Sequence, residues 1–158
     1  MKIQKIVLFD IDYTLFNTDI FKASDLQTHS IYKEVPGVLK KLSNIAMLGI
    51  FSEGKLLLQQ TKLEKTKIDT FFIKEHTHIV EKKDVSIGEM LKKYKNHVLY
   101  LVDDKLTVLH QASLLMPEVV TIWIKRGIYA ENQKPIENYT PRAIIYSLEE
   151  VIPLVTAA

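Results

Sequence analysis

The sequence predicts an α/β fold in which a mainly parallel central sheet is covered by helices on both faces, giving three layers. Two observations favour it. Short apolar runs rich in branched residues alternate with longer segments in which apolar residues recur at helical spacing. The 158 residues, 47% hydrophobic and 25% charged, contain no repeat, linker or low-complexity tract. This length and composition predict a single domain, residues 1–158.

The first half of the chain predicts two strands, each followed by a polar segment and a helix. Lys5–Phe9 is a continuous apolar run that ends in acids, as a buried strand opening into a loop does. Pro36 and Gly37 introduce a helix whose apolar positions are Val38, Leu39, Leu42 and Ile45. Residues 47–51 form a second strand. A helix over about 55–66 follows, with these residues on nearby turns: Leu56, Leu57, Gln60 and Leu63.

The second half continues the alternation. Two short apolar pieces, 71–73 and 79–80, precede a helix that Asp84 can cap and that carries Ile87, Met90, Leu91 and Tyr94. The clearest strand, 98–102, runs into an acid pair and then a helix that stops before Pro117. The remaining elements are a strand over 119–124, a short strand over 143–146 and a closing helix over 148–155. Strands that alternate with helices predict parallel pairing through right-handed crossovers.

Polar side chains follow the three strongest strands. The first ends at Asp10 and Asp12, the second at Ser52, and the third at Asp103 and Asp104. In an open parallel sheet, ligands bind outside the carboxyl ends of the strands. We therefore expect these acids and this hydroxyl to converge at one edge of the sheet.

These residue types predict phosphoryl chemistry. Closely spaced carboxylates repel one another unless a divalent cation lies between them, and oxygen-only ligands favour Mg²⁺. Asp10 and Asp104, with Asp103 beside them, fit that role. A cation also lets an anionic carboxylate approach a phosphate, and carboxylates form aspartyl-phosphates. The sequence therefore predicts a magnesium-dependent phosphomonoesterase in which Asp10 is the nucleophile.

The other polar residues complete such a site. Asp12, two residues after Asp10, can protonate the departing alkoxide and later take a proton from water. Ser52 lies between a strand and a helix, where its hydroxyl and nearby N–H groups can bind phosphate. A lysine is expected to balance the charge of the transferring phosphoryl group.

Four segments, in order, resemble the motifs of the haloacid dehalogenase (HAD) superfamily of phosphohydrolases. FDIDYTL, residues 9–15, resembles its first motif, and IFSEG, residues 50–54, is similar to its second. Lys82 or Lys83 falls where its lysine is expected, and LVDD, residues 101–104, resembles its acidic fourth motif. The resemblance covers nearly the whole chain. It implies a Rossmann-like, HAD-like fold with a mainly parallel sheet.

The resemblance also implies a role for each matching residue. Asp10 becomes the nucleophile, Asp12 the acid/base and Ser52 the phosphate-binding hydroxyl. Lys82 or Lys83 becomes the stabilising cation, and the alignment with Asp84 favours Lys82. The metal set is the side chain of Asp10, the backbone carbonyl of Asp12, Asp104, and Asp103 as a ligand or its close support; Thr14 is expected to hold the loop.

Two departures from the motifs and the short spacing refine this expectation. No proline follows the lysine, and Thr107, Val108 and Leu109 occupy a region where a further acid is often found, which predicts weaker metal affinity. About 40 residues separate Asp10 from Ser52, which is too few for a cap domain. We expect a capless (C0-like) phosphatase whose site is open to solvent unless a neighbouring subunit covers it, as in a homo-oligomer. Phosphoproteins, nucleic-acid ends, sugars and nucleotides all remain as substrate classes.

Composition excludes several other functions. There is no cysteine for a disulfide or a thiolate site, and no apolar run long enough to span a bilayer or resemble a signal peptide, so we expect a cytoplasmic protein. The net charge of +2, with lysines interleaved among acids, argues against a nucleic-acid-binding surface, although a nucleic acid could be a substrate. His76 and His78 alternate as zinc ligands can, but no third ligand lies nearby.

Two alternatives come from other functional classes. A receiver-like phospho-regulatory domain also combines α/β layers, acids and magnesium, but its phosphorylated aspartate follows the third strand, whereas here the second strong strand ends in Ser52. A catalytically silent HAD-like binding module is the other alternative. The presence of both Asp10 and Asp12 argues against it.

Overall fold

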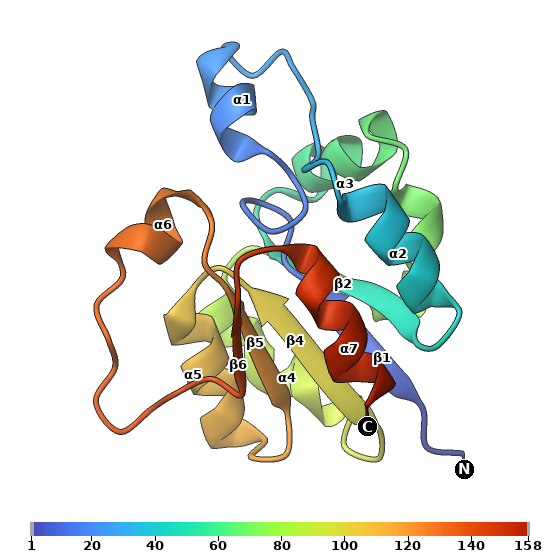
Figure 1. Ribbon diagram of the computed structural model, residues 1–158, viewed down its shortest axis with the longest axis vertical. Coiled ribbons are helices and arrows are strands. Elements are labelled where there is room, and N and C mark those ends of the chain that lie inside the picture. Colours follow the sequence, from blue (N-terminus) through green and yellow to red (C-terminus); the bar gives the residue numbers. More distant parts are fainter. Residues whose placement is uncertain (1, 158) are drawn as a thin grey trace.

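A computed structural model describes residues 2–157, which form a six-stranded sheet between two layers of helices (Figure 1). The order across the sheet is β3-β2-β1-β4-β5-β6, and every neighbouring pair is parallel. This is the order of doubly wound Rossmann-like sheets, so the predicted fold class is confirmed. The strands are β1 Lys5–Phe9, β2 Met47–Glu53, β3 Thr77–Val80, β4 Val98–Asp103, β5 Val120–Ile124 and β6 Ala143–Ile145.

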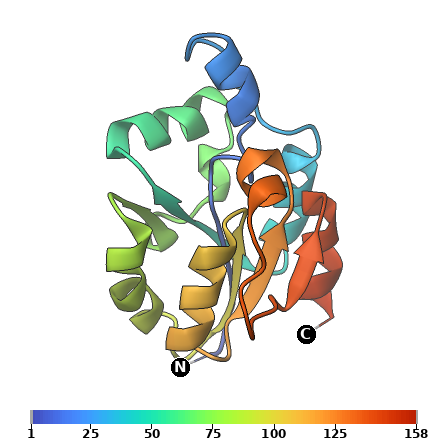
Figure 2. The same ribbon diagram turned by 90° about the vertical axis from the view of Figure 1, so that its left-hand side faces the viewer.

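The helices divide into two covering layers and a third group at the carboxyl edge. α2 and α7 pack on one face of the sheet, and α4 and α5 on the other. α1, α3 and α6 lie beyond the carboxyl ends of the strands (Figures 1 and 2). None of the helices in the described part of the chain is long and apolar enough to cross a bilayer. The helices are α1 Thr18–Ala23, α2 Val35–Ser43, α3 Leu56–Lys65, α4 Lys83–Lys92, α5 Leu106–Leu115, α6 Gly127–Asn132 and α7 Val151–Thr156, with 3-10 turns at Asp69–Phe71, Lys74–His76 and Leu148–Glu150.

The sheet separates two apolar cores. Because successive side chains of a strand point to opposite faces, Val7 and Phe9 enter the core beneath α2 and α7, while Ile6 and Leu8 enter the core beneath α4 and α5. All four are fully buried. Burial on both faces explains why β1 is a continuous apolar run in the sequence. It also holds the end of β1, and thus Asp10, in a fixed position.

Three elements differ from the sequence expectations. Residues 17–34, expected to be a polar stretch, contain the six-residue α1, whose first turn is capped by the Asn17 side chain accepting from the Ile20 N–H. α6 was not expected, and the closing helix is divided into a 3-10 turn and α7. Segments of six residues are too short to show a helical period.

The buried face of α3 also differs from the predicted one. Leu56 and Leu57 are exposed, whereas Gln59, Lys62 and Leu63 are buried. The reason is the position of α3 at the carboxyl edge, where Leu63 enters the apolar core beneath α2 but Gln59 and Lys62 meet polar groups of the loops.

Candidate active site

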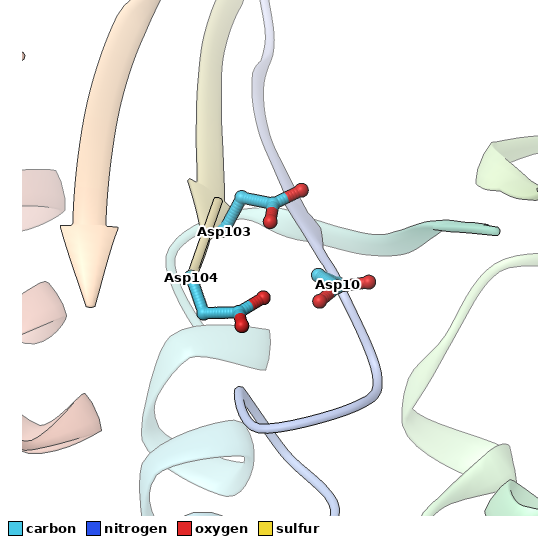
Figure 3. Close-up of side chains that lie close together, drawn as sticks. All are labelled: Asp10, Asp103 and Asp104. Atoms are coloured by element: carbon cyan, nitrogen blue, oxygen red, sulfur yellow. The ribbon is translucent and has the colours of Figure 1, made fainter. Parts of the chain in front are cut away.

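Three aspartates from two neighbouring strands meet at the carboxyl edge of the sheet (Figure 3). β1 and β4 pair in register, with Phe9 opposite Val102, so Asp10 lies beside Asp103. The Asp10 N–H donates to the carbonyl of Val102 at 3.0 Å and extends the pairing by one residue. One carboxylate oxygen from each of Asp10, Asp103 and Asp104 lies within 4.8 Å of the others. The structure thus brings together the acids that follow the first and third predicted strands.

Lys83 joins this cluster, and Lys82 does not. The Lys83 ammonium lies 2.9 Å from Oδ1 of Asp10 and 2.6 Å from Oδ2 of Asp103. The structure therefore places Lys83, and not the favoured Lys82, beside these acids. Lys82 is the exposed N-cap residue of α4, with extended backbone, whereas Lys83 begins the helix and is buried. The Lys83 N–H donates to Oε1 of Glu53 at 2.9 Å, which fixes this first turn against the end of β2.

The two adjacent aspartates of the fourth motif have different surroundings. Both oxygens of Asp103 accept hydrogen bonds, Oδ2 from Lys83 and Oδ1 from the Lys105 N–H at 2.9 Å. Both oxygens of Asp104 are buried and have no hydrogen-bond partner among residues 2–157. An unpaired buried carboxylate is costly, which indicates a missing partner. Both oxygens of Asp104 are therefore available to bind a cation in this acidic site. Asp103 instead holds the lysine.

Burial and mutual repulsion shift the pKa values of this cluster. Burial raises the pKa of Asp10 to about 6, although the charge of Lys83 opposes the shift. Burial, and then the charges of Asp10 and Asp103, raise the pKa of Asp104 far above its ordinary value. Burial acts to lower the pKa of Lys83, but the two carboxylates beside it raise that pKa above its usual range. The single ammonium of Lys83 therefore cannot neutralise the three carboxylates, and the cluster needs further positive charge.

A divalent cation fits the residues present. The donor set is entirely oxygen, and Asp104 offers two oxygens without a partner in the described chain. Asp10 lies beside Asp104, and its Oδ1 accepts a hydrogen bond from the Lys83 ammonium. The charge deficit and the free oxygens both favour a cation between Asp10 and Asp104, with Asp103 in a supporting position.

The main chain of Asp104 is fixed by a residue of β5 and one at the end of α6. The indole Nε1 of Trp123 donates to the Asp104 carbonyl at 2.9 Å, and the Gln133 amide donates to the same oxygen at 2.7 Å. The Gln133 side-chain oxygen in turn accepts from the N–H of Leu106, in the first turn of α5. These contacts hold the turn in which the Asp104 side chain projects into the site.

A tight loop follows Asp10. The carbonyl of Ile11 accepts the N–H groups of Thr14, Leu15 and Phe16, at 3.2, 3.0 and 2.9 Å. Thr14 is buried, yet its hydroxyl has no partner among the described residues, so the backbone rather than this side chain holds the loop. The loop also places Tyr13 in the left-handed region, at a φ of 62°.

Asp12 points toward α3 rather than toward the other acids. Its Oδ1 lies 2.8 Å from the Lys62 ammonium and accepts the Thr18 hydroxyl at 3.1 Å. Its Oδ2 accepts the Gln59 amide at 3.1 Å. The side chain of Asp12 therefore does not belong to the metal-type cluster, which contains Asp10, Asp103 and Asp104. A metal contact through its backbone carbonyl stays a prediction.

Ser52 is fully buried at the penultimate position of β2. Its Oγ accepts the Gln59 amide at 2.7 Å, so its own proton can be directed elsewhere. α3 begins only at Leu56, after a turn at Gly54 with a φ of 147°. A Cβ at Gly54 would lie 3.1 Å from the Gln59 side chain, which explains the glycine. Ser52 thus sits within the strand rather than at the helix start.

The acids line a cavity of about 230 Å³. Asp10, Asp12 and Asp104 form its floor side, and α1 and α6 add Phe21 and Tyr129 to its wall. The expected absence of a cap domain holds for residues 2–157, but α1 and α6 contribute to the cavity wall. Figure 2 shows both short helices beyond the carboxyl ends of the strands.

His76, in the 3-10 turn before β3, and His78, in β3, both contact the hydroxyl of one tyrosine. Nδ1 of His76 lies 3.1 Å from the Tyr94 hydroxyl, and Nε2 of His78 lies 2.6 Å from it. Within residues 2–157 the group of three potential metal ligands is that of the aspartates, and these two histidines do not belong to it.

Four residues at the site were not identified from the sequence. Gln59 and Lys62 share one face of α3, where a three-residue spacing of polar groups is the available signal. Trp123 and Gln133 act on Asp104 through the backbone, and nothing in their spacing indicates this.

Comparison with solved structures shows the fold. No protein-family model and no curated protein matches the sequence. A haloacid dehalogenase-like hydrolase from Burkholderia xenovorans LB400 is similar at a TM-score of 0.79 and 15% identity, covering 99% of this chain and 98% of that one. The HAD-hydrolase YfnB from Bacillus subtilis, bound to magnesium, is similar at a TM-score of 0.70 and 12% identity, covering 98% and 99%.

Similar structures differ in their chemistry. They include a phosphatase from Clostridium difficile and an L-2-haloacid dehalogenase. The chain therefore has the HAD-like fold, and the choice between these chemistries depends on the residues of its own site.

Proposed function

We propose that this chain is a HAD-superfamily phosphatase that hydrolyses phosphomonoesters with Mg²⁺ through an aspartyl-phosphate on Asp10. The observation that carries the proposal is the meeting of Asp10 with Asp104, whose two buried oxygens have no partner, beside the paired ammonium of Lys83. When bound, Mg²⁺ would neutralise charge and act as a Lewis acid at phosphoryl oxygens, with Asp10 and Asp104 as its side-chain ligands.

The first half-reaction uses Asp10 and Asp12. A carboxylate oxygen of Asp10 attacks phosphorus, and the bond from phosphorus to the ester oxygen breaks. Asp12 donates its proton to the departing oxygen, so an alcohol leaves. Lys83 and the Ser52 hydroxyl stabilise the negative charge of the transferring group. The hydrogen bond from Gln59 to Ser52 Oγ favours this role because it leaves the hydroxyl proton free to donate.

The second half-reaction returns the site to its starting state. The Asp12 carboxylate takes a proton from water, whose oxygen attacks phosphorus and breaks the acyl-phosphate bond. Inorganic phosphate leaves, and Asp10 and Asp12 regain their original forms. Asp12 is near enough to line the same cavity as Asp10.

The residues favour phosphoryl transfer over dehalogenation, the other chemistry found among similar structures. Dehalogenation by a carboxylate needs no metal and no second aspartate in the first motif. This site has Asp12 and the unpaired Asp104, which such a reaction leaves without a role. A receiver-like function is disfavoured as well, because receiver sheets have the order 2-1-3-4-5 and β3 here is followed by Glu81 and Lys82.

The test is phosphate release from purified protein with Mg²⁺. The panel contains small phosphomonoesters, phosphopeptides and end-phosphorylated oligonucleotides, since the phosphorylated partner can be free or part of a macromolecule. We expect release that requires Mg²⁺ and is absent in Asp10→Asn. Equal release from wild type and Asp10→Asn would refute the nucleophile. Release from no substrate would favour the binding-module alternative, and halide release from 2-haloacids would favour dehalogenation.

A further inference from the structure

The inner face of α3 carries a charge where an apolar residue would be expected. Gln59 is 1% exposed and Lys62 is 5% exposed, while Leu56 and Leu57 of the same helix are 57% and 77% exposed. Burying an ammonium is costly unless it is paired. The helix therefore turns its first leucines outward and keeps a lysine inside, which indicates that Lys62 has a specific partner.

That partner is Asp12, and each of its oxygens is held separately. Lys62 reaches Oδ1 at 2.8 Å, and Gln59 donates to Oδ2 at 3.1 Å. Thr18, at the start of α1, adds its hydroxyl to Oδ1 at 3.1 Å. The carboxylate is thus fixed in both position and rotation, by two residues of α3 and one of α1.

The surroundings of Lys62 leave Asp12 as the anionic partner of its ammonium. Its ammonium lies over the rings of Phe16 and Phe21, at 5.2 and 5.3 Å from their centroids. Aromatic faces stabilise a cation but accept no full hydrogen bond. Asp12 is the one carboxylate with which Lys62 forms an ion pair in the described chain. The pair is partly shielded from water, so it is stronger than an exposed pair.

Gln59 connects Asp12 to the other polar group of the site. Its amide nitrogen donates both to Asp12 Oδ2, at 3.1 Å, and to Ser52 Oγ, at 2.7 Å. One side chain therefore sets the separation of Asp12 from Ser52. Because Ser52 accepts from Gln59, its proton is directed away from α3.

We propose that Lys62 and Gln59 are positioning residues that hold Asp12 as the proton donor to the leaving group. The proposal rests on the function proposed above. When Asp12 gives its proton to the ester oxygen, it becomes a carboxylate whose two oxygens already face an ammonium and an amide. These contacts stabilise the product of the proton transfer and hold the carboxylate in the lining of the cavity for the water step.

The proposal predicts a dependence on the leaving group. An alkoxide is a poor leaving group and needs its proton as the bond to phosphorus breaks, whereas p-nitrophenolate leaves without one. Loss of Lys62 should therefore slow hydrolysis of ethyl phosphate strongly and that of p-nitrophenyl phosphate little. A general loss of packing would slow both substrates equally.

The experiment compares kcat of wild type, Lys62→Met and Lys62→Gln on ethyl, phenyl and p-nitrophenyl phosphate with Mg²⁺. We expect Lys62→Met to lose about tenfold or more on ethyl phosphate and less than about threefold on p-nitrophenyl phosphate. Lys65→Met, on the exposed side of the same helix, is the matched control and should equal wild type on all three. Gln59→Leu should show the same trend and also raise KM, because Ser52 loses its hydrogen-bond donor.

Each outcome decides a separate point. A loss in Lys62→Met that is equal on all three substrates, or no loss on any, would overturn the positioning role. If Lys62→Met does not fold, Lys62→Gln, which keeps a donor but no charge, replaces it under the same criterion. Wild type inactive on all three substrates and on the wider panel would refute the proposed function itself, whereas active wild type with leaving-group-independent variants refutes only the role of Lys62.

Discussion

The ammonium of Lys83 lies 2.6 Å from Oδ2 of Asp103; both groups are buried, and Lys83 lines the cavity. The pair sits between α4 and the end of β4. Asp103 thereby holds the Lys83 ammonium in a position where it also contacts Asp10. This ion pair distinguishes Lys83 from its neighbour Lys82. It also distinguishes Asp103, which holds the lysine, from Asp104, whose oxygens have no partner in the described chain.

Replacement of Lys83 is expected to abolish most of the activity. Lys83→Met should lower kcat/KM by about 10²- to 10³-fold, because a fixed donor to the transferring phosphoryl group is lost. Lys82→Met is the control and should retain wild-type activity, since Lys82 is an exposed cap residue. Steady-state phosphate release measures both. A Lys82→Met variant with the larger loss would contradict the assignment.

Magnesium binding is expected to depend on Asp104. Asp104→Asn removes a carboxylate that has no partner in the described chain, so the variant without metal should be at least as stable as wild type. Wild type should gain about 1.4 kcal/mol of unfolding free energy when free Mg²⁺ is ten times its Kd. Thermal melts with and without Mg²⁺ measure this. A wild-type melt that does not respond to Mg²⁺, or an unchanged response in Asp104→Asn, would count against the metal site.

A decrease in pH is expected to lower the unfolding free energy through His78, which lies in the edge strand β3. Burial, and then the charges of Lys93 and His76, lower the pKa of His78 to about 4 from an ordinary value of 6.5. Between these values the unfolded chain binds a proton that the folded chain does not, so stability falls as pH decreases from about 6.5 to 4. For a half-buried group the loss should be about 1 to 2 kcal/mol.

The comparison is with His78→Gln, which does not titrate. Urea unfolding at a series of pH values should show a shallower acid limb in the variant, with the difference confined to pH 4 to 6.5. Parallel curves for the two proteins across this range would show that His78 is not the group responsible.

Gly127 is expected to tolerate no side chain. Its φ is 79°, and a Cβ there would clash with Cδ1 of the buried Tyr13. Gly127→Ala should lower the unfolding free energy by about 2 kcal/mol or more and reduce activity, because Tyr13 belongs to the loop after Asp10. Gly37→Ala is the control. Gly37 lies in α2 with open space around it, so the change should be neutral or stabilising by up to about 1 kcal/mol.

The strands and the acids at their ends were predictable because their signals are local. Continuous apolar runs such as Lys5–Phe9 arise from burial on both faces, and parallel topology then brings Asp10 and Asp104 to one edge. The choice between Lys82 and Lys83 was not predictable in this way. Consecutive helical residues differ by about 100° in direction, so one residue in the start of α4 decides which lysine faces the site.

The role of α3 was hidden for a related reason. Leu56 and Leu57 indicated an apolar inner face, and because lysines are rarely buried, nothing in the sequence marked Lys62 as an inward-facing residue. The partner that makes its burial tolerable, Asp12, is fifty residues away in the chain. Such a pairing becomes visible only when the end of β1 and the helix after β2 are placed together in space.

The two short helices at the border of the cavity connect its wall to the acidic site. α1 and α6 contribute Phe21 and Tyr129 to the wall, and neither contains any of the three clustered aspartates. Thr18, in α1, nevertheless donates to Asp12, and Gln133, at the end of α6, donates to the Asp104 carbonyl. An insertion that lengthens either segment should therefore leave the register of β1 with β4 intact and still disturb Asp12 or Asp104.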